Sequence, residues 1–443
     1  MFAASFVPAW RLSGAGVGMT SATRVTGTGS GLGGSGGSGG GTWSAWKPLL
    51  ALGIAKCGRS RGRAARGLQA LAEVVEISAE VGLGLVSPQG AKAGAVLIEE
   101  DPLLQTSKDE RLPESAARFR TLPQGTKQKL LALAATPGQA EKEVGFSGDE
   151  LRFVRVLRTN SVSVPGAGGA VYKTACRANH SCRPNASLCV GPDARMRLKA
   201  LRDIEPGEDI QVSYIGEGDL LRPTQHRQKQ LASWGFKCGC VRCSGPEDTR
   251  AFTCAACGTG LMHYEKSEVS GHRWGPCSCC QAVLPAETLR GAEEQWLDHV
   301  QSLRPESQEA LAPVMAAAMY EGLCSSLAEG GPTAGPALEG HWVSAKLARL
   351  AAEELVRQRR YQEAREAAAV LRSYVRRTLG SAATRATAFA TYIEAWVLAE
   401  TGDPAALQLA EQAAQEADLL PRSGDQLRIK VEEVKDLARK VTA

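Results

Sequence analysis

The sequence predicts an α+β fold, in which small β-sheets and a cysteine-rich, zinc-binding region precede an α-helical C-terminal domain. Short runs of β-branched residues, broken by glycine and proline, begin at Val74. Paired cysteines follow these runs, and from about Leu289 onward alanine, leucine, glutamate, glutamine and arginine dominate with helical spacing. The change of pattern along the chain therefore predicts strands first and helices last.

The composition is that of an ordinary globular protein. The 443 residues are 43% hydrophobic and 22% charged, which excludes a fibrous protein. The longest apolar run near the N-terminus, Leu49–Ala55, is much shorter than the roughly 18 residues of a membrane span. We therefore expect no interaction with the interior of a membrane.

Residues 1–72 form a Gly/Ser/Arg-rich leader that we expect to be disordered. Glycine and serine dominate Gly27–Gly41, arginines cluster at Arg59–Arg66, and no acidic residue precedes Glu73. Such a composition buries too little apolar surface to fold. It also resembles an organelle transit peptide, although a solvated tail or a nuclear import signal fits as well, and we favour the nucleus or cytoplasm. Because the leader carries the excess positive charge, the pI near 8.5 is no argument for nucleic-acid binding.

Residues 74–215 carry the strand-like runs. The predicted strands are Val74–Ile77, Ala95–Glu99, Ser187–Val190, Arg195–Ala200 and Asp209–Tyr214. Between about residues 105 and 160, the segment Leu112–Ala135 carries helix-forming residues and predicts a short helical insert.

Residues 289–443 are predicted to be helical. Gly402-Asp403-Pro404 indicates a helix stop followed by a new start. Two similar stretches, Tyr361–Ala367 and Asp403–Leu409, are offset by about 42 residues, which exceeds the ~34 of a regular tetratricopeptide (TPR) repeat. We therefore expect a degenerate, TPR-like helical domain.

The cysteines predict metal sites. All but two of the 13 lie between Cys176 and Cys280, mostly in closely spaced pairs, and a chain without a secretory signal keeps its thiols reduced. Cys238, Cys240 and Cys243 are one ligand short of a closed zinc site. We favour Cys182 as the fourth ligand, and its nearest competitors are the two other cysteines of this part of the sequence, Cys176 and Cys189.

A second group of cysteines, within residues 250–284, has the spacing of a zinc ribbon. Its four predicted ligands are Cys254, Cys257, Cys277 and Cys280, and Cys279 is the alternative to Cys280. Four protein ligands leave no open coordination position for water. Both predicted zinc ions are therefore structural.

Four motifs in a fixed order carry a family resemblance. They are Gly82-Leu83-Gly84, the segment Arg177–Asn185 with Asn179-His180-Ser181-Cys182, the segment Glu205–Tyr214, and Trp234-Gly235-Phe236 with the cysteines that follow it. Each motif alone is uninformative. Together they resemble the SET-domain protein-lysine methyltransferase family, and most closely its SET and MYND (SMYD-like) branch.

This resemblance implies an S-adenosylmethionine-dependent protein-lysine N-methyltransferase that acts on a histone or non-histone protein. Tyr214 would be the catalytic residue, and Cys182 matches the family's fourth zinc ligand. The implied cofactor-binding residues are Gly82, Leu83, Gly84, Arg177, Asn179, His180, Tyr214 and Phe236. The domains would be SET (74–215), post-SET zinc region (216–245), zinc ribbon (250–284) and helical domain (289–443).

The chain also departs from this branch. A cysteine-rich MYND finger, common before the motif at residues 177–185, is missing here, and the helical insert is short. Leu83 stands where a basic residue is common, but the expected contact there is through the main chain. The departures therefore concern the choice of partner and substrate more than the cofactor.

Two other classes of function compete with the enzyme. A catalytically weak SET scaffold would bind partners through the ribbon and the helices, but the retention of Tyr214 with the glycines and Asn179-His180 favours catalysis. A nucleic-acid binder would rest on the ribbon, where His272-Arg273-Trp274 is the main basic-aromatic cluster, and we expect Trp274 to pack in the protein instead. We expect a monomer whose partner is a protein with a target lysine.

Overall fold

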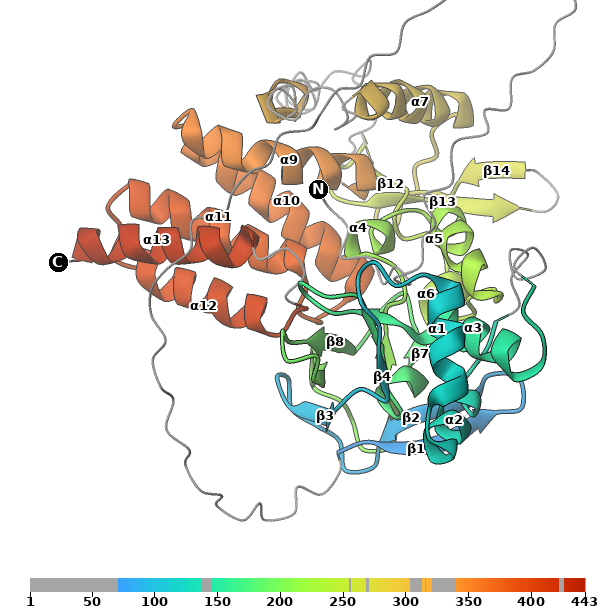
Figure 1. Ribbon diagram of the computed structural model, residues 1–443. Helices are drawn as coiled ribbons and strands as arrows, with labels where there is room; N and C mark the ends of the chain where they lie inside the picture. Colours follow the sequence, from blue (N-terminus) through green and yellow to red (C-terminus); the bar gives the residue numbers. More distant parts are fainter. Residues whose placement is uncertain are drawn as a thin grey trace, which may run out of the picture. The chain divides into compact units, whose positions relative to one another are not determined.

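The computed structural model describes residues 71–136, 145–254, 256–267, 271–302, 313–314, 316–320, 340–421 and 426–442 (Figure 1). All of them belong to one compact unit. The predicted leader lies outside the described residues, apart from its last two, and Ala72 is already buried in the core. Among the helices of the described part, none is both long and apolar enough to cross a bilayer.

The first sheet holds the N-terminal glycine motif. Strands β1 (Glu73–Ser78), β2 (Gly82–Ser87) and β10 (Glu208–Asp209) pair in the order β1-β2-β10, and both pairs are antiparallel. Gly82 has a φ of 78° at the start of β2, a left-handed conformation that favours glycine. The predicted strand Val74–Ile77 is confirmed as part of β1.

The second sheet forms the core of the β-rich part. Strands β3 (Val96–Glu100), β9 (Met196–Ala200) and β8 (Ala186–Val190) pair antiparallel in that order, which confirms three predicted strands. All residues of β8 are buried, whereas β9 alternates between buried and half-buried residues. A third, small sheet has the order β4 (Leu104–Gln105), β6 (Gly169–Val171) and β5 (Val162–Ser163).

The predicted strand Asp209–Tyr214 is divided between two sheets. Its first part is β10, whereas β11 (Gln211–Val212) pairs in parallel with β7 (Asn179–His180). The backbone N–H of Ile210, between the two, donates to the carbonyl of Leu85. One segment of chain thereby brings the glycine motif of β2 and the motif at Asn179 together.

The insert is helical, as predicted, but it consists of separate helices. Helices α1 (Leu112–Thr121) and α2 (Gln124–Leu131) are divided at Pro123, which lacks the backbone N–H that a continuous helix would need. A third helix, α3 (Gly148–Asn160), packs on them, with the rings of Phe119 and Phe153 stacked 4.4 Å apart.

The cysteine-rich region contains short helices and a three-stranded sheet. The helices are α4 (Glu217–Leu220), α5 (Thr224–Leu231) and α6 (Val241–Ser244). The strands β12 (Ala251–Thr253), β13 (Leu261–Ser267) and β14 (Gly271–Trp274) pair antiparallel in sequence order. Trp274 is buried against Phe252 and Tyr264, with ring centroids 5.6 and 5.3 Å away, so it packs within the ribbon as expected.

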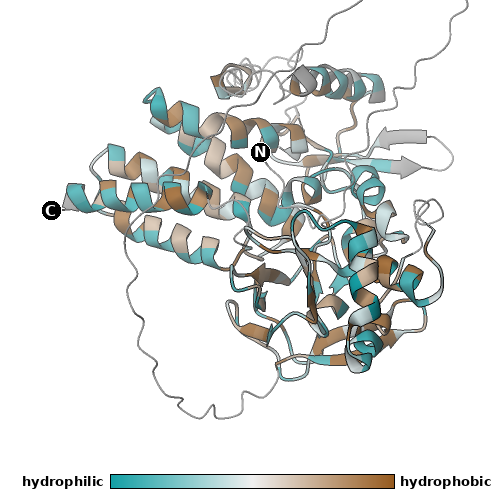
Figure 2. Cartoon of the chain, in the orientation of Figure 1, coloured by the Kyte–Doolittle hydropathy of each residue, from teal (hydrophilic) through white to brown (hydrophobic). Residues whose placement is uncertain are grey.

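Helices follow to the end of the chain. They are α7 (Ala286–Ser302), α9 (Trp342–Arg357), α10 (Tyr361–Leu379), α11 (Arg385–Glu400), α12 (Ala406–Asp418) and α13 (Gln426–Thr442). Hydrophobic and hydrophilic residues alternate around most of these helices (Figure 2), whereas α11 is buried along most of its length. Gly402, with a φ of 78°, lies between α11 and α12, which confirms the predicted stop and restart. A TPR-like arrangement stays a prediction.

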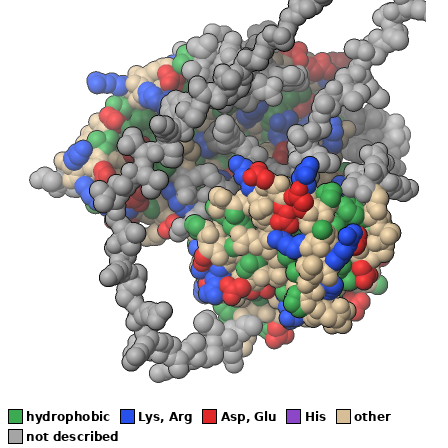
Figure 3. All heavy atoms as spheres, in the orientation of Figure 1, with side chains coloured by type: hydrophobic (Ala, Val, Ile, Leu, Met, Phe, Trp, Pro, Cys, Tyr) green, Lys and Arg blue, Asp and Glu red, His purple; other side chains and the backbone are tan. Residues whose placement is uncertain are grey.

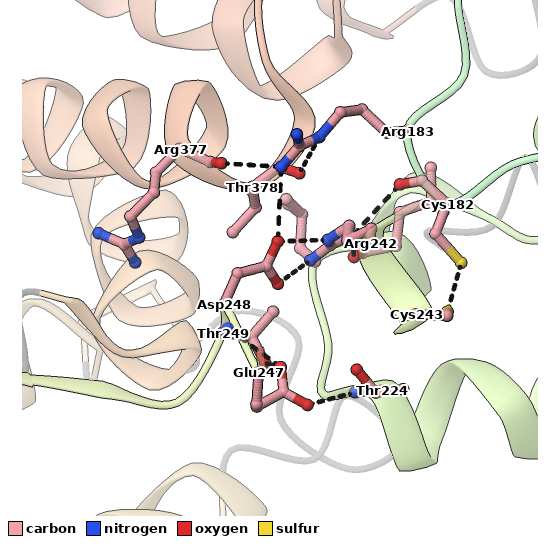
Figure 4. Close-up of polar contacts among 12 residues, drawn as sticks. Cys182, Arg183, Thr224, Arg242, Cys243, Glu247, Asp248, Thr249, Arg377 and Thr378 are labelled. Atoms are coloured by element: carbon pink, nitrogen blue, oxygen red, sulfur yellow. Dashed lines mark hydrogen bonds and ion pairs between the residues drawn. The ribbon is translucent and has the colours of Figure 1, made fainter. Parts of the chain in front are cut away.

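A buried ion-pair network around Arg242 and Asp248 joins the cysteine-rich region to the β-rich part and, through Arg183, to α10 (Figure 4). The Arg242 side chain is 1% exposed and donates to Asp248 over 2.7 and 3.0 Å. Its third nitrogen donates to the carbonyls of Cys182 and Leu220. Asp248 also pairs with Arg183, whose guanidinium donates to carbonyls at the end of α10.

Replacing Asp248 by alanine should destabilise the protein strongly. The substitution leaves the Arg242 guanidinium buried without its counter-charge, which typically costs about 3–5 kcal/mol of unfolding free energy. The measurement is urea denaturation followed by circular dichroism. As a control, Lys92→Ala removes an exposed ion pair and should leave the midpoint unchanged within error. Equal midpoints for the two variants would contradict the interpretation.

Candidate active site

The four motifs predicted to form one pocket lie on neighbouring elements. Gly82-Leu83-Gly84 begins β2, and Asn179-His180 forms β7, directly after the 3₁₀ helix η2 (Ala175–Arg177). Tyr214 follows β11, which pairs with β7. Phe236 follows the 3₁₀ helix η3 (Ala232–Trp234). Contacts between side chains then bring the motifs together.

Asn179 lies directly against the glycine motif. Its Nδ2 donates to the carbonyl of Leu83 over 3.2 Å. A Cβ at Gly84 would lie 2.7 Å from this nitrogen and 2.5 Å from Cγ1 of Ile77, so a larger residue would push Asn179 away. Leu83 is 46% exposed, and its main-chain carbonyl is the group that Asn179 contacts.

Asn185, directly before β8, bonds the chain of β10 and β11. It is 2% exposed, and its Oδ1 accepts from the backbone N–H of Gln211, while its Nδ2 donates to the carbonyl of Asp209 and to Glu208. The N–H of Ser181 donates to the carbonyl of Val212 on the other side. Because strands of two residues offer few ladder hydrogen bonds, this buried amide supplies the missing ones.

His180 connects the tyrosine to the cysteine cluster. Its Nδ1 accepts from the backbone N–H of Tyr214 over 3.0 Å, and its Nε2 lies 3.3 Å from Sγ of Cys182. Burial lowers the pKa of His180 to about 4, so the imidazole is neutral at physiological pH. Because Nδ1 accepts a hydrogen bond, Nε2 carries the hydrogen and donates it to the Cys182 sulfur.

The Tyr214 hydroxyl is held in one orientation. It donates to the carbonyl of Ala178 over 2.9 Å, and burial raises the pKa of Tyr214, so the phenol stays neutral. Ala178 directly follows η2. The carboxylate of Glu100 binds the start of η2, because it accepts from the backbone N–H groups of Thr174, the residue before η2, and Ala175 over 3.0 and 2.6 Å. Sequence analysis missed Glu100, because no local pattern marks a carboxylate so far from the segment that it binds.

Aromatic rings surround the Tyr214 side chain. The ring centroids of His180, Trp234 and Phe236 lie 5.4, 5.9 and 6.2 Å from that of Tyr214. Phe236 is 38% exposed, and its ring centroid lies 6.1 Å from that of His180. The Trp234 Nε1 is buried without a hydrogen-bond partner in the described structure. Trp234 was not among the predicted site residues, although it belongs to the motif that ends in Phe236.

The helical insert also reaches this cluster. The Thr136 hydroxyl donates to the carbonyl of Trp234 over 3.1 Å, and Gly235 has a φ of 74°. A Cβ at Gly235 would lie 2.7 Å from Cγ2 of Thr136. The insert therefore contributes to the position of Trp234 and Phe236. Arg177 lies on η2, but its side chain makes no hydrogen bond within the described part of the chain, and its supporting role stays a prediction.

The first cysteine group comprises the four residues expected from the sequence. The sulfurs of Cys182, Cys238, Cys240 and Cys243 lie within 4.8 Å of one another. The two competing cysteines lie elsewhere: Cys176 donates to the carbonyl of Asn160, and Cys189 to that of Leu419. Tetrahedral zinc with ligands at ~2.3 Å has its sulfurs about 3.8 Å apart, close to the 3.5 Å between Cys182 and Cys243.

The second cysteine group also has four sulfurs within 4.8 Å, those of Cys254, Cys257, Cys277 and Cys280. Cys279 is exposed and lies outside the group. Backbone N–H groups donate to the sulfurs, as from Gly260 to Cys257 over 3.3 Å, and a Cβ at Gly260 would lie 2.2 Å from the Cys277 sulfur. Both all-sulfur groups could hold a zinc ion without an open position, so neither has the ligand set of a catalytic metal.

Comparison with known proteins identifies the domain that carries the first three of these motifs. A SET domain model matches residues 82–215. The histone-lysine N-methyltransferase set5 of Schizosaccharomyces pombe is 29% identical over 168 residues, which cover 38% of this chain and 48% of that protein. The histone-lysine N-methyltransferase SMYD3 of Homo sapiens is 40% identical over 98 residues, covering 20% of this chain and 22% of that protein. The chain thus matches about half of these relatives or less.

Among solved structures, the SET domain of LSMT bound to MeLysine and AdoHcy aligns with 82% of this chain and 95% of its own. The sequence identity is 13% and the TM-score is 0.30. Likeness at this level is too low for a comparison of individual side chains.

The two sulfur groups predict how zinc content responds to single substitutions. We expect about two zinc ions per chain, because each group offers four thiolates. Cys182→Ser and Cys280→Ser should each lower this value by about one, whereas Cys279→Ser, outside the group, should not change it. The measurement is metal analysis of purified protein by mass spectrometry. If Cys279→Ser lost zinc and Cys280→Ser retained it, Cys279 and not Cys280 would be the fourth ligand.

Proposed function

We propose that this chain, which contains a SET domain at residues 82–215, is an S-adenosylmethionine-dependent protein-lysine N-methyltransferase. The observation that carries the proposal is the position of Tyr214. Its backbone is bonded to His180, its hydroxyl is oriented by Ala178, and its ring lies among the aromatic side chains of His180, Trp234 and Phe236. The names of the two relatives, both histone-lysine N-methyltransferases, support the same reaction.

The residues around Tyr214 fit the methyl donor. The main chain at Gly82 is approachable because nothing lies within 4 Å of its Cβ position, whereas Gly84 makes room for Ile77 and Asn179. Asn179 and His180 would hold the amino-acid and adenine portions. The exposed ring of Phe236 would stack on the adenine. Bound S-adenosylmethionine supplies an electrophilic methyl group on a sulfonium. Methyl transfer is an in-line displacement, so the protein must chiefly align the lysine nitrogen.

The lysine must lose its proton before it can attack. A free lysine has a pKa near 10.4, and aromatic walls of low polarity disfavour its ammonium form. The rings of Tyr214, Trp234 and Phe236 would supply such walls. Because Tyr214 donates its own hydrogen to Ala178, its oxygen retains the capacity to accept a hydrogen bond from the neutral amine.

The two sulfur groups would bind structural zinc. Four thiolates and one Zn²⁺ carry a net charge of −2, and buried donors around the first group offset it. The His180 Nε2–H faces Cys182, and the fully buried Arg227 lies 3.7 Å from the Cys243 sulfur. Zinc at Cys182 would thus fix the cofactor motif to the segment that carries Phe236.

The partner we propose is a protein with a target lysine, in the nucleus or cytoplasm. On the face shown in Figure 3, acidic and basic side chains of the described residues are interspersed. Such a surface gives no support to binding of nucleic acid, which favours a continuous basic patch. We also propose that the protein is a monomer. The TPR-like helices and the domain limits given above remain part of this proposal.

Tyr214→Phe should lower turnover at least about tenfold while leaving cofactor affinity within about twofold. The variant keeps the ring and the backbone bond to His180 but loses the hydroxyl that orients the amine. The measurement is transfer of radiolabelled methyl groups to a histone mixture and to a cell lysate, with calorimetry for S-adenosylmethionine.

The matched control is Tyr172→Phe. It also removes a buried tyrosine hydroxyl bonded to a backbone carbonyl, that of Ala194, but outside the aromatic cluster, so its turnover should stay near that of the wild type. Absence of labelling by the wild type, despite measurable cofactor binding, would instead favour a catalytically weak scaffold.

The raised pKa of Tyr214 predicts the alkaline side of the pH profile. An ordinary tyrosine ionises near pH 10, and burial moves the pKa of Tyr214 above that value. The neutral phenol therefore persists while the substrate lysine, with a pKa near 10.4, loses its proton. We expect kcat/KM for a lysine peptide to rise with pH up to about 10. A decline between about pH 8 and 10 in a protein still folded by circular dichroism would contradict this.

A further inference from the structure

The chain directly after Tyr214 is bound by three helices of the C-terminal part. Residues 217–222, which include α4, begin only three positions after the tyrosine. Helices α9, α10 and α11 each contact this segment through a different residue. Because few residues separate these contacts from Tyr214, they bear on the position of the candidate catalytic hydroxyl.

The strongest of these contacts is made by Glu217. One carboxylate oxygen accepts from the backbone N–H of Arg385 over 2.6 Å, and the other from that of Ala386 over 2.7 Å. These are the first two residues of α11, and the next N–H, that of Thr387, is bound by the Thr384 hydroxyl. Glu217 thus satisfies helix-start N–H groups that have no partner within the helix, at the end where the helix dipole favours negative charge.

Helices α9 and α10 hold the other end of the segment. The buried hydroxyl of Tyr374 on α10 donates to the carbonyl of Leu221 over 2.6 Å. The guanidinium of Arg222 lies 3.9 Å from the ring centroid of Trp342 on α9, a cation–π contact. Both ends of the segment are therefore fixed to helices distant in sequence.

The chain between this segment and Tyr214 has little freedom. Ile215 and Gly216 are buried, and the Ser213 hydroxyl bonds both the N–H and the carbonyl of Ile215. The carbonyl of Gly216 accepts from Leu220 over 2.9 Å. A shift of Glu217 would therefore be transmitted to Tyr214 instead of being absorbed by a loop.

We infer that Glu217 is a positioning residue, through which helix α11 sets the place of Tyr214 in the active site. The inference rests on the proposed methyltransferase function. Other contacts already join the helices to the β-rich part: Lys199 donates to the carbonyl of Asp418 and Ser187 to that of Leu419. Glu217 is thus one of several contacts across this boundary, and the one nearest in sequence to Tyr214.

The test is Glu217→Gln in the full chain, compared with the wild type. One oxygen remains as an acceptor, but an amide NH₂ now faces a backbone N–H. Burial raises the pKa of Glu217, so a neutral side chain should be accommodated and the protein should fold. We expect kcat to fall at least about tenfold with the KM for S-adenosylmethionine within about twofold, because alignment and not binding is lost.

Hydrogen exchange gives a readout that does not depend on activity. The N–H of Tyr214 donates to Nδ1 of His180, so its exchange rate reports this contact. In Glu217→Gln, a peptide covering residues 209–216 should exchange faster, by about tenfold, whereas β8 and β9 should be unchanged. Glu217→Ala, which removes both acceptors, should give a larger effect in the same direction.

The matched control is Lys199→Met, which also removes a hydrogen bond between the helices and the β-rich part, but on β9 and not in the segment that follows Tyr214. It should keep wild-type kcat and exchange at residues 209–216. Equal kcat and equal exchange for the wild type and Glu217→Gln would overturn the inference. A loss of kcat in Lys199→Met as large as that in Glu217→Gln would overturn it as well. If the wild type transfers no methyl group, the proposed function fails, and the exchange result alone then decides whether Glu217 positions Tyr214.

Discussion

Strands β7 and β11 are two residues long, yet their parallel pairing brings the candidate site together. It places Asn179 beside Gln211 and His180 beside Val212, so that Tyr214 emerges next to the imidazole. The segment that leads to β11 has just left β10, which pairs with β2 through Asp209 and Val86. So short a ladder offers few backbone bonds, and buried side chains complete it: the Asn185 amide bonds the backbone of Gln211 and Asp209. The site therefore depends on a few specific polar groups more than on extended secondary structure.

Seven of the eight cysteines in the two sulfur groups lie between Cys238 and Cys280, among buried apolar residues such as Phe252 and Trp274. Metal binding would supply folding free energy there, since such a site does not exist in the unfolded chain. Polar contacts also stabilise the chain around the first group. Gln228 bonds both the N–H and the carbonyl of Cys238, and Arg242 holds the carbonyl of Cys182. The segment with Phe236 is thus fixed on one side by its cysteines and on the other by Thr136 of the insert.

Local patterns in the sequence predicted the strands around Leu188 and Leu198, the helical C-terminal part and the helix stop at Gly402. The shortage of one ligand beside Cys238 predicted a fourth ligand from elsewhere, and the sulfur of Cys182, which was favoured over Cys176 and Cys189, lies in that group. The roles of the site residues stay predictions. The division of one predicted strand at Ile210 could not be foreseen, because the change of partner depends on a tertiary contact with Leu85. Glu100, Trp234 and Glu217 were missed for a related reason: each acts on backbone or rings that are distant in sequence.

The carboxylates of Glu100 and Glu217 make the same kind of contact at the starts of two helical segments. Each accepts two backbone N–H groups at the start of a helical turn, η2 for Glu100 and α11 for Glu217. Glu100 thereby fixes the carbonyl of Ala178 that orients the Tyr214 hydroxyl, whereas Glu217 fixes the chain that follows the tyrosine. In the proposed methyl transfer, a phenol that orients the lysine nitrogen in line with the methyl group tolerates little displacement. Support of the Tyr214 hydroxyl from η2, together with the inferred support of its backbone from α11, would restrict both ends of this residue. The two-residue strand β11 could not do this alone.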